Sequence, residues 1–154
     1  MKRILSILLV LALAMLVFTG CDTLKNGLLG GNLSDNQNNE VVADALWESA
    51  TYLIDTELGE GAKTVEVEVK AGEKSITFTI HTDKETLGDA MLEHGLIAGE
   101  QGAYGLYVKL VNGIEADYDK DGTYWGFYKN GEMMMVGVDG ATIADGEHYE
   151  LVKE

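Results

Sequence analysis

Residues 64–81 have the sequence TVEVEVKAGEKSITFTIH, and this stretch decides the fold. Valines at positions 65, 67 and 69 alternate with charged residues, and Ile76, Phe78 and Ile80 then alternate with polar residues. A period of two puts the apolar side chains of each half on one face of a half-buried strand. Residues 71–74 (AGEK) separate the halves and predict a turn. The stretch is therefore expected to be a β-hairpin.

One helix is expected directly after this hairpin. Thr82 and Glu85 have the spacing of a capping box, in which the Thr side chain and the Glu carboxylate each accept from a free backbone N–H. A stripe at helical spacing follows, made of Leu87, Ala90, Met91 and His94. Gly95 stands where a left-handed C-terminal cap is wanted. The pattern predicts a helix over about residues 84–94.

The rest of the chain is rich in strand signals. Further strands are predicted at residues 106–111, about 123–129, 133–138 and 148–152, with turns at 112–113 (NG), 130–131 (NG) and 145–146 (DG). Residues 45–54 have irregular apolar spacing, which favours a short strand and leaves a helical turn as the alternative. We expect an α+β fold, a β-grasp-like antiparallel or mixed sheet with one helix packed across it.

The N-terminus predicts export. Lys2 and Arg3 precede an apolar run over residues 4–18, and small residues follow before Cys21, as in a signal peptide. The run is shorter than the roughly 20 residues that a membrane-spanning helix needs. Residues 17–21 (VFTGC) resemble a bacterial lipobox, with Phe18 where that motif most often has Leu. We expect a signal peptide over residues 1–20 and lipid on Cys21, the alternative being ordinary cleavage with Cys21 as an incidental thiol.

A tether and one domain are expected after Cys21. Residues 22–40 are rich in Gly, Asn, Ser and Asp without an apolar period, which predicts a flexible linker within residues 21–44. Residues 45–154 have the size of one ordinary domain. Because Cys21 is the sole cysteine, this domain is stabilised by its core and not by an internal disulfide. The expected location is the extracytoplasmic side of the cell membrane, with the lipid as anchor.

The charge of the chain excludes several partners. The formal net charge is −15 at pH 7, and loss of Lys2 and Arg3 would make it more negative still. Nucleic acids and anionic lipid surfaces are bound by clustered Lys and Arg, so neither is an expected partner of the domain itself. The expected partners are the membrane, through the N-terminal lipid, and either a small molecule or another exported protein.

No catalytic arrangement stands out, and metal binding has one weak candidate. Asp117, Asp119 and Asp121 alternate before Gly122 like the first half of a calcium loop, but Tyr128 stands where an EF-hand needs a glutamate. The three histidines lie on different predicted elements without zinc spacing. No serine lies in a nucleophile-elbow context. The sequence therefore predicts neither an enzyme nor a required cofactor.

The aromatic run at residues 124–128 (YWGFY) is the most informative candidate for ligand binding. On a strand, Tyr124 and Tyr128 share one face with Gly126 between them, and Trp125 and Phe127 share the other. One face is expected to be core. The other is a candidate ligand platform with a gap at Gly126, joined by Tyr107 and Tyr104. Methionines 133–135 are either pliable packing or a binding lip.

These residues also carry a family resemblance. Residues 64–153 resemble the C-terminal β-domain of transcobalamin and intrinsic factor, and the transcobalamin-like domains of exported bacterial proteins. The landmarks, in order, are residues 86–91 (TLGDAM), 104–108 (YGLYV), 111–114 (VNGI), 124–127 (YWGF), 137–138 (GV) and 145–147 (DGE). The resemblance implies a β-grasp-type ligand-binding domain, which in the cobalamin carriers closes over one side of a corrinoid. Those carriers bury most of the ligand in a helical domain that has no counterpart in this sequence.

Two hypotheses of function follow. The first is a cell-surface lipoprotein with a non-catalytic small-ligand-binding module, with cobalamin or another corrinoid as the candidate ligand. It predicts an exposed, concave aromatic patch that includes Tyr107, Tyr124, Trp125, Phe127 or Tyr128. The second is an extracellular protein-interaction or structural domain without a small-molecule ligand, and it predicts a flat sheet face or a free strand edge.

Overall fold

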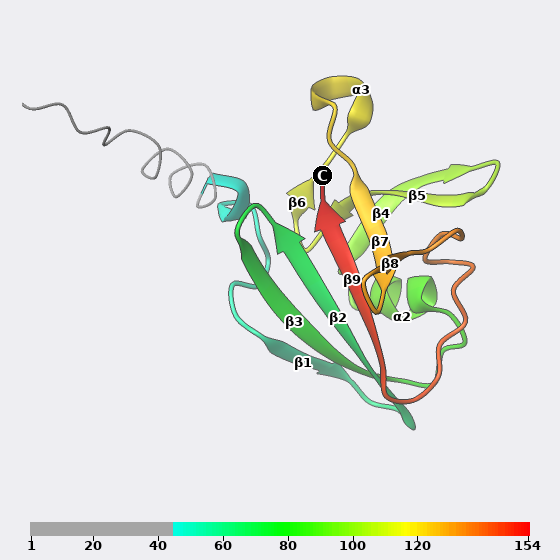
Figure 1. The fold of residues 1–154 in the computed structure, drawn as a ribbon. Coiled ribbons are helices and arrows are strands. Elements are labelled where there is room, and N and C mark those ends of the chain that lie inside the picture. The colour runs from blue at the N-terminus through cyan, green and yellow to red at the C-terminus, as the bar shows by residue number, and fades with distance from the viewer. Residues whose placement is uncertain (1–44) are drawn as a thin grey trace, which may run out of the picture. The chain divides into compact units, whose positions relative to one another are not determined.

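The computed structural model describes residues 45–154, which form two β-sheets, the short helices α2 and α3 and a helical turn at residues 45–47 (Figure 1). The larger sheet has six strands in the order β1-β3-β2-β9-β7-β8, and the smaller has three in the order β4-β5-β6. The predicted α+β class and the mixed sheet are confirmed. The prediction of one sheet is wrong, because β4, β5 and β6 pair only with one another.

The hairpin predicted from residues 64–81 is present as β2 (Lys63–Ala71) and β3 (Lys74–Thr82). Their apolar residues pair across the strands and are buried, with Val67 opposite Phe78. β9 (Glu147–Lys153) lies parallel to β2 on its other side, and β1 (Thr56–Gly59), which the sequence did not predict, lies parallel to β3. The hairpin therefore forms the centre of the larger sheet.

β7 (Trp125–Lys129) and β8 (Glu132–Met133) complete that sheet. Asn130 and Gly131 join them with φ angles of 54° and 76°, which confirms the predicted two-residue turn. The predicted strand over residues 133–138 is wrong beyond Met133. The N–H of Met134 still donates to the carbonyl of Phe127, and the chain then leaves the edge of the sheet. Further on, the carbonyl of Val138 accepts a hydrogen bond from the N–H of Gly88 in the helix.

The smaller sheet consists of β4 (Ile97–Gly102), β5 (Gly105–Val111) and β6 (Ile114–Glu115). β5 was predicted, whereas β4 was not among the predicted strands. Asn112 and Gly113 form a second two-residue turn, with φ angles of 52° and 80°, between β5 and β6. Gly99 allows β4 to approach β5 closely, because a Cβ at this position would lie 2.0 Å from the carbonyl oxygen of Tyr107.

The helix α2 spans Leu87–Glu93, and its N-cap is Thr86. The Thr86 hydroxyl accepts from the backbone N–H of Asp89 at 3.2 Å. The prediction that Thr82 caps the helix is wrong, because Thr82 ends β3 and its hydroxyl accepts locally from the N–H of Lys84. A second helix, α3, is a single turn over Tyr118–Asp121.

Residues 45–47 form a helical turn, so the strand favoured for residues 45–54 is wrong. Trp47 is buried, and its indole N–H donates to the carbonyl of Ala71 at 3.0 Å. The segment that follows is held by Asn112, whose side-chain amide makes 2.9 Å bonds to both the N–H and the carbonyl of Tyr52. Tertiary hydrogen bonds thus set the conformation where the local pattern was ambiguous.

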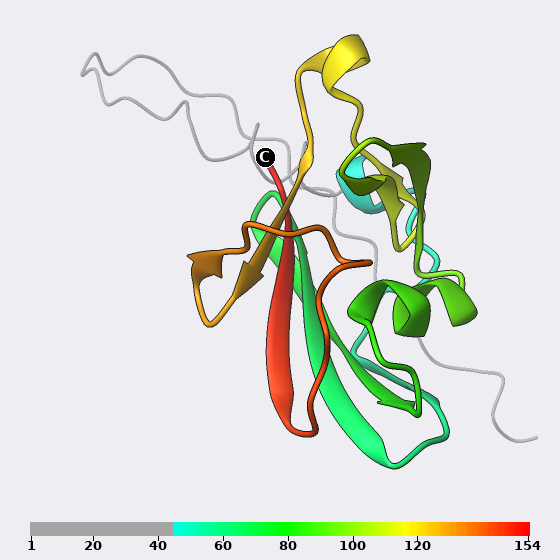
Figure 2. The ribbon, with the colours of Figure 1, turned by 90° about the vertical axis from the view of Figure 1, so that its right-hand side faces the viewer.

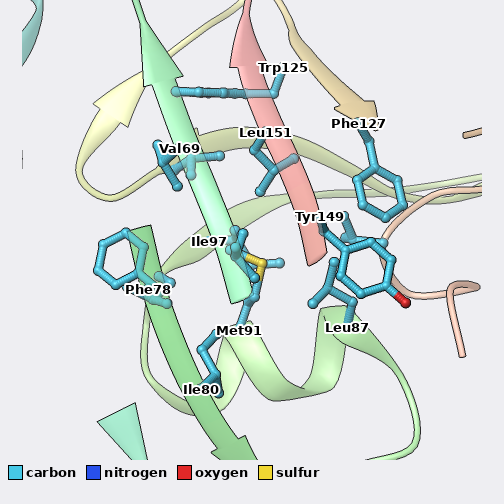
Figure 3. Close-up of a cluster of buried hydrophobic side chains, with 14 of the residues drawn as sticks. Val69, Phe78, Ile80, Leu87, Met91, Ile97, Trp125, Phe127, Tyr149 and Leu151 are labelled. Atoms are coloured by element: carbon cyan, nitrogen blue, oxygen red, sulfur yellow. The ribbon is translucent and has the colours of Figure 1, made fainter. Parts of the chain in front are cut away.

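The main core lies between the larger sheet and a layer made of α2 and the smaller sheet (Figures 1 and 2). Figure 3 shows Leu87 and Met91 of α2 among Ile80, Tyr149 and Leu151 of the sheet. We call the opposite side of the larger sheet the outer face. No described helix or strand covers the outer face (Figure 2).

Within the described residues, no helix is long and apolar enough to cross a membrane. The predicted signal peptide, the lipidation site at Cys21 and the tether lie outside the described residues. These three features remain expectations from the sequence.

Candidate ligand-binding surface

The aromatic strand β7 has one buried and one outer side. Trp125 and Phe127 are buried in the core, and the Phe127 ring stacks on Tyr149 at 5.8 Å between centroids (Figure 3). Tyr124 and Tyr128, which alternate with them, lie on the outer side and are partly exposed. Of the four aromatic candidates on this run, the structure therefore leaves the two tyrosines accessible to a ligand.

Glu154 joins the two tyrosines, and the sequence gave no reason to single it out. The Tyr124 hydroxyl donates to its Oε2 at 2.5 Å, and the Tyr128 hydroxyl donates to its Oε1. Backbone bonds of 2.9 Å in both directions between Tyr124 and Glu154 bring the carboxylate to this position. These phenols lower the pKa of Glu154, and the same bonds raise the pKa of Tyr124 and raise that of Tyr128 to about 12.

The gap expected at Gly126 is filled by these groups. A Cβ at Gly126 would lie 2.8 Å from the Cε2 atom of Tyr128 and 3.1 Å from Oε1 of Glu154. The Tyr128 ring therefore leans over the glycine. The outer side of β7 is therefore a filled aromatic and carboxylate surface.

Two methionines extend this surface. Met133 pairs with Tyr128 in the β7–β8 ladder, so both side chains are on the outer face. Met134 bonds to Phe127 and packs against the core, and Met135 then follows on the solvent side. Met133 and Met135 are 54% and 94% exposed. We call Tyr124, Tyr128, Met133 and Met135 the outer patch.

Tyr107 and Tyr104 are not part of the outer patch. Tyr107 lies on β5, where its neighbours Leu106 and Val108 pack against the core, so its own side chain faces away from the larger sheet. Lys109 lies over its ring at 5.8 Å. Tyr104 is fully exposed at the tip of the β4–β5 hairpin. The structure thus separates the predicted tyrosines into two surfaces.

The acidic candidates are engaged in local structure. Asp117 is the N-cap of α3, accepts from the N–H of Asp119, and forms ion pairs with Lys109 at 3.4 Å and Lys120 at 3.6 Å. Burial raises the pKa of Asp117, but the bond from Asp119 and the charge of Lys109 outweigh it, so the net pKa is lowered. Asp121 accepts from Thr123. Among residues 45–154, no three His, Cys, Asp or Glu residues are grouped as a metal site requires.

The histidines also lie apart. His81 contacts Glu57 through Nε2 at 2.7 Å and Thr64 through Nδ1 at 3.0 Å. His94 is the C-cap residue of α2, and its Nε2 lies close to Gly59. These contacts bring neither His81 nor His94 next to a second histidine.

The fold defines the described residues as an α+β domain with two sheets. The chain is similar at residues 84–149 to a family described as a domain of unknown function (DUF4430). Among solved structures, it is similar to a protein from Ruminococcus gnavus described as a "putative metal binding protein". That structure has 31% sequence identity and a TM-score of 0.57, and the match covers 60% of this chain and 97% of the other. The chain belongs to the family of this R. gnavus protein.

The fold is also similar to part of haptocorrin in complex with Cbi. The TM-score is 0.51 at 18% identity, and the match covers 63% of this chain. The chain spans only 26% of the haptocorrin chain. At this identity the likeness shows the fold, and it agrees with the resemblance to cobalamin carriers in the sequence. No curated protein sequence matches the chain.

Proposed function

We propose that this protein is a non-catalytic ligand-binding module, held by lipid on Cys21 at the extracytoplasmic side of the cell membrane. The ligand is an amphipathic small molecule, and a corrinoid is the candidate. The outer patch is the observation that carries this proposal. It presents two tyrosine rings and the exposed Met133 on a sheet face that no described element covers, and the exposed Met135 follows two residues further along the chain.

Two further facts support a corrinoid. The landmark residues resemble those of the cobalamin carriers, and haptocorrin, whose structure contains cobinamide, has the same fold in one part. Tyrosine and methionine suit such a ligand, because both offer apolar contact to a flat surface. A sheet face covers one side of the ligand only, so the expected affinity is micromolar or weaker.

Titration of the full chain carrying Cys21→Ser, in detergent, with dicyanocobinamide and cyanocobalamin tests this proposal. Binding is followed by calorimetry and by tryptophan quenching corrected for ligand absorbance. Tyr128→Ala is expected to weaken binding at least tenfold. Leu92→Ala is the matched control, since Leu92 is an exposed apolar residue of α2 on the other side of the sheet.

The possible results discriminate clearly between surfaces. Loss of affinity in Tyr104→Ala but not in Tyr128→Ala would move the site to the β4–β5 hairpin. Absence of heat and quenching at hundreds of micromolar ligand would refute the corrinoid. For the anchor, a Cys21→Ser chain whose signal peptide is removed normally and which still stays with membranes through a high-salt wash would refute lipidation of Cys21 as the means of attachment.

A protein-interaction module is the second candidate, and the edge of the smaller sheet favours it. In β4, five of the six residues are exposed, and one edge of this strand is not paired by any described strand. Such an edge can accept an extended segment of another exported protein. Protection of β4 amides from hydrogen exchange by a partner, with no change at the outer patch, would support this candidate over the first.

A further inference from the structure

The two Asn-Gly turns of the described residues have the same sequence and opposite surroundings. Asn112-Gly113 joins β5 to β6, and Asn130-Gly131 joins β7 to β8, with positive φ angles at all four residues. Asn-Gly is the pair in which an asparagine side chain reacts most readily with its own backbone, because glycine has no side chain that shields the peptide nitrogen. The fold therefore decides which of the two asparagines can react.

The turn at Asn112 is locked. Asn112 is only 1% exposed, and its side-chain amide makes 2.9 Å bonds to the N–H and the carbonyl of Tyr52. Its backbone N–H donates to the carbonyl of Leu96 at 2.7 Å. Gly113 is packed against the chain, since a Cβ there would lie 2.4 Å from the carbonyl oxygen of Ser49. The Asn112 side chain cannot turn towards the nitrogen of Gly113 without breaking these contacts.

The turn at Asn130 is open. Asn130 and Gly131 are both exposed, and a Cβ at Gly131 would meet nothing within 4 Å. The N–H of Gly131 donates to Oε1 of Glu150 at 3.1 Å. β8 has two residues and lies at the edge of the larger sheet, so little pairing holds this hairpin closed. Exposed edge elements of this kind open at low cost in free energy.

We propose that Asn130 is a site of deamidation and isomerisation by the chain itself. When the turn opens, the backbone nitrogen of Gly131 loses its proton to solvent and attacks the side-chain carbonyl carbon of Asn130. The new C–N bond closes a cyclic imide, and the side-chain nitrogen takes up a proton and leaves as ammonia. Water then opens the imide at either carbonyl, which gives aspartate or isoaspartate. The net reaction consumes one water and releases one ammonia, and it needs no further reactant.

This reaction would change the outer patch. Either product adds a carboxylate to the turn whose Gly131 N–H contacts the carboxylate of Glu150. In isoaspartate the main chain also runs through the side-chain carbon, which lengthens the turn by one backbone atom. The extra atom shifts β8 against β7, so Met133 no longer pairs with Tyr128. The modification is independent of the proposed function, because it requires no ligand.

The test ages the full chain carrying Cys21→Ser, in detergent and mildly alkaline buffer, with and without urea. Digestion and peptide mass spectrometry follow the gain of one mass unit at each asparagine, and isoaspartyl methyltransferase labelling detects isoaspartate. The reading by peptide separates Asn26, which precedes Gly27 outside the described residues. In the folded chain Asn130 is expected to react at least tenfold faster than Asn112. In urea the two rates should agree within about threefold, since the fold that separates them is gone.

The Asn130→Asp variant is the matched control for the effect on the patch. It adds the charge without the extra backbone atom, and Asp tolerates a positive φ as Asn does. Cross-strand NOEs between Tyr128 and Met133 should persist in this variant and disappear in aged chain enriched in isoaspartate. Equal rates at Asn130 and Asn112 in the folded chain, or no mass gain at Asn130, would overturn the site. Unchanged NOEs in the isoaspartate form would overturn its effect on the patch.

Discussion

Replacing Glu147 by Gln should destabilise the fold at neutral pH and progressively less in acid. The Glu147 carboxylate lies at the start of β9, with Lys129 Nζ at 2.5 Å from one oxygen and the Ala144 N–H at 2.9 Å from the other. The Tyr149 hydroxyl also donates to it. Its side chain is only 23% exposed, so these contacts are poorly screened by water.

The pKa of Glu147 gives the magnitude. Burial alone would raise it, but the bonds from Lys129, Tyr149 and Ala144 outweigh burial and lower the pKa from 4.5 to about 2. At about 1.4 kcal/mol per tenfold change in acidity, the ionised carboxylate contributes about 3 kcal/mol to folding. Because the folded pKa is the lower one, this contribution is complete above pH 4.5 and is lost as the pH falls towards 2.

Urea unfolding of Glu147→Gln and the parent chain at pH 7 and pH 3 measures this. The difference in unfolding free energy should be about 3 kcal/mol at pH 7 and about half of that at pH 3. Glu66→Gln, at an exposed position on β2, is the control and should change little at either pH. A Glu147→Gln effect that is the same at both pH values would refute the reasoning, since it would not come from the charge.

Three substitutions test the fold. Thr86→Ala removes the N-cap of α2 and should cost about 1 kcal/mol in urea unfolding; no loss would remove Thr86 from that role. Asn112→Ala should lower the unfolding free energy by about 2–3 kcal/mol in the same assay, because it removes the hydrogen-bond partners of both backbone groups of Tyr52. Asn112→Gly also lacks these bonds but tolerates the φ of 52°, so the difference between the two variants gives the part of the loss that comes from backbone strain. Gly99→Ala should abolish β4–β5 cross-strand NOEs. Gly140→Ala is the control, because a Cβ there would meet its nearest atoms at 3.6 Å.

The sequence predicted those elements whose signal is local. The β2–β3 hairpin and β9 follow from strict alternation, and both Asn-Gly turns have the positive φ angles that their residues tolerate. β4 gave no such signal, because residues 97–102 (IAGEQG) are mostly exposed and exist as a strand only through pairing with β5. A strand stabilised by its partner cannot be recognised from its own pattern.

The start of α2 shows how tertiary contacts choose between equal local signals. Thr82 and Thr86 are each followed three residues later by an acidic residue, so both fit a helix start. In the fold, Thr82 belongs to the ladder with β2, and the carbonyl of Glu85 accepts from Ile143. Only Thr86 is then free to cap the helix. The strand predicted at residues 133–138 failed similarly, because Val138 is drawn towards α2.

For the candidate site, the alternation of residues predicted which side chains of β7 share a face. The neighbours of these side chains depend on how β7 pairs with β8 and β9, which the sequence does not reveal. The position of Glu154 beside Tyr124 depends on how β9 aligns with β7, and the cross-strand position of Met133 beside Tyr128 depends on the turn at residues 130–131. The same register explains why the outer face is filled at Gly126 and carries no notch. A flat protein surface contacts only one side of a ligand, so it binds that ligand through the few side chains that project from the surface. In the outer patch the exposed groups are the Tyr124 and Tyr128 rings and the side chains of Met133 and Met135, and the proposed flat ligand would contact them with one of its sides only.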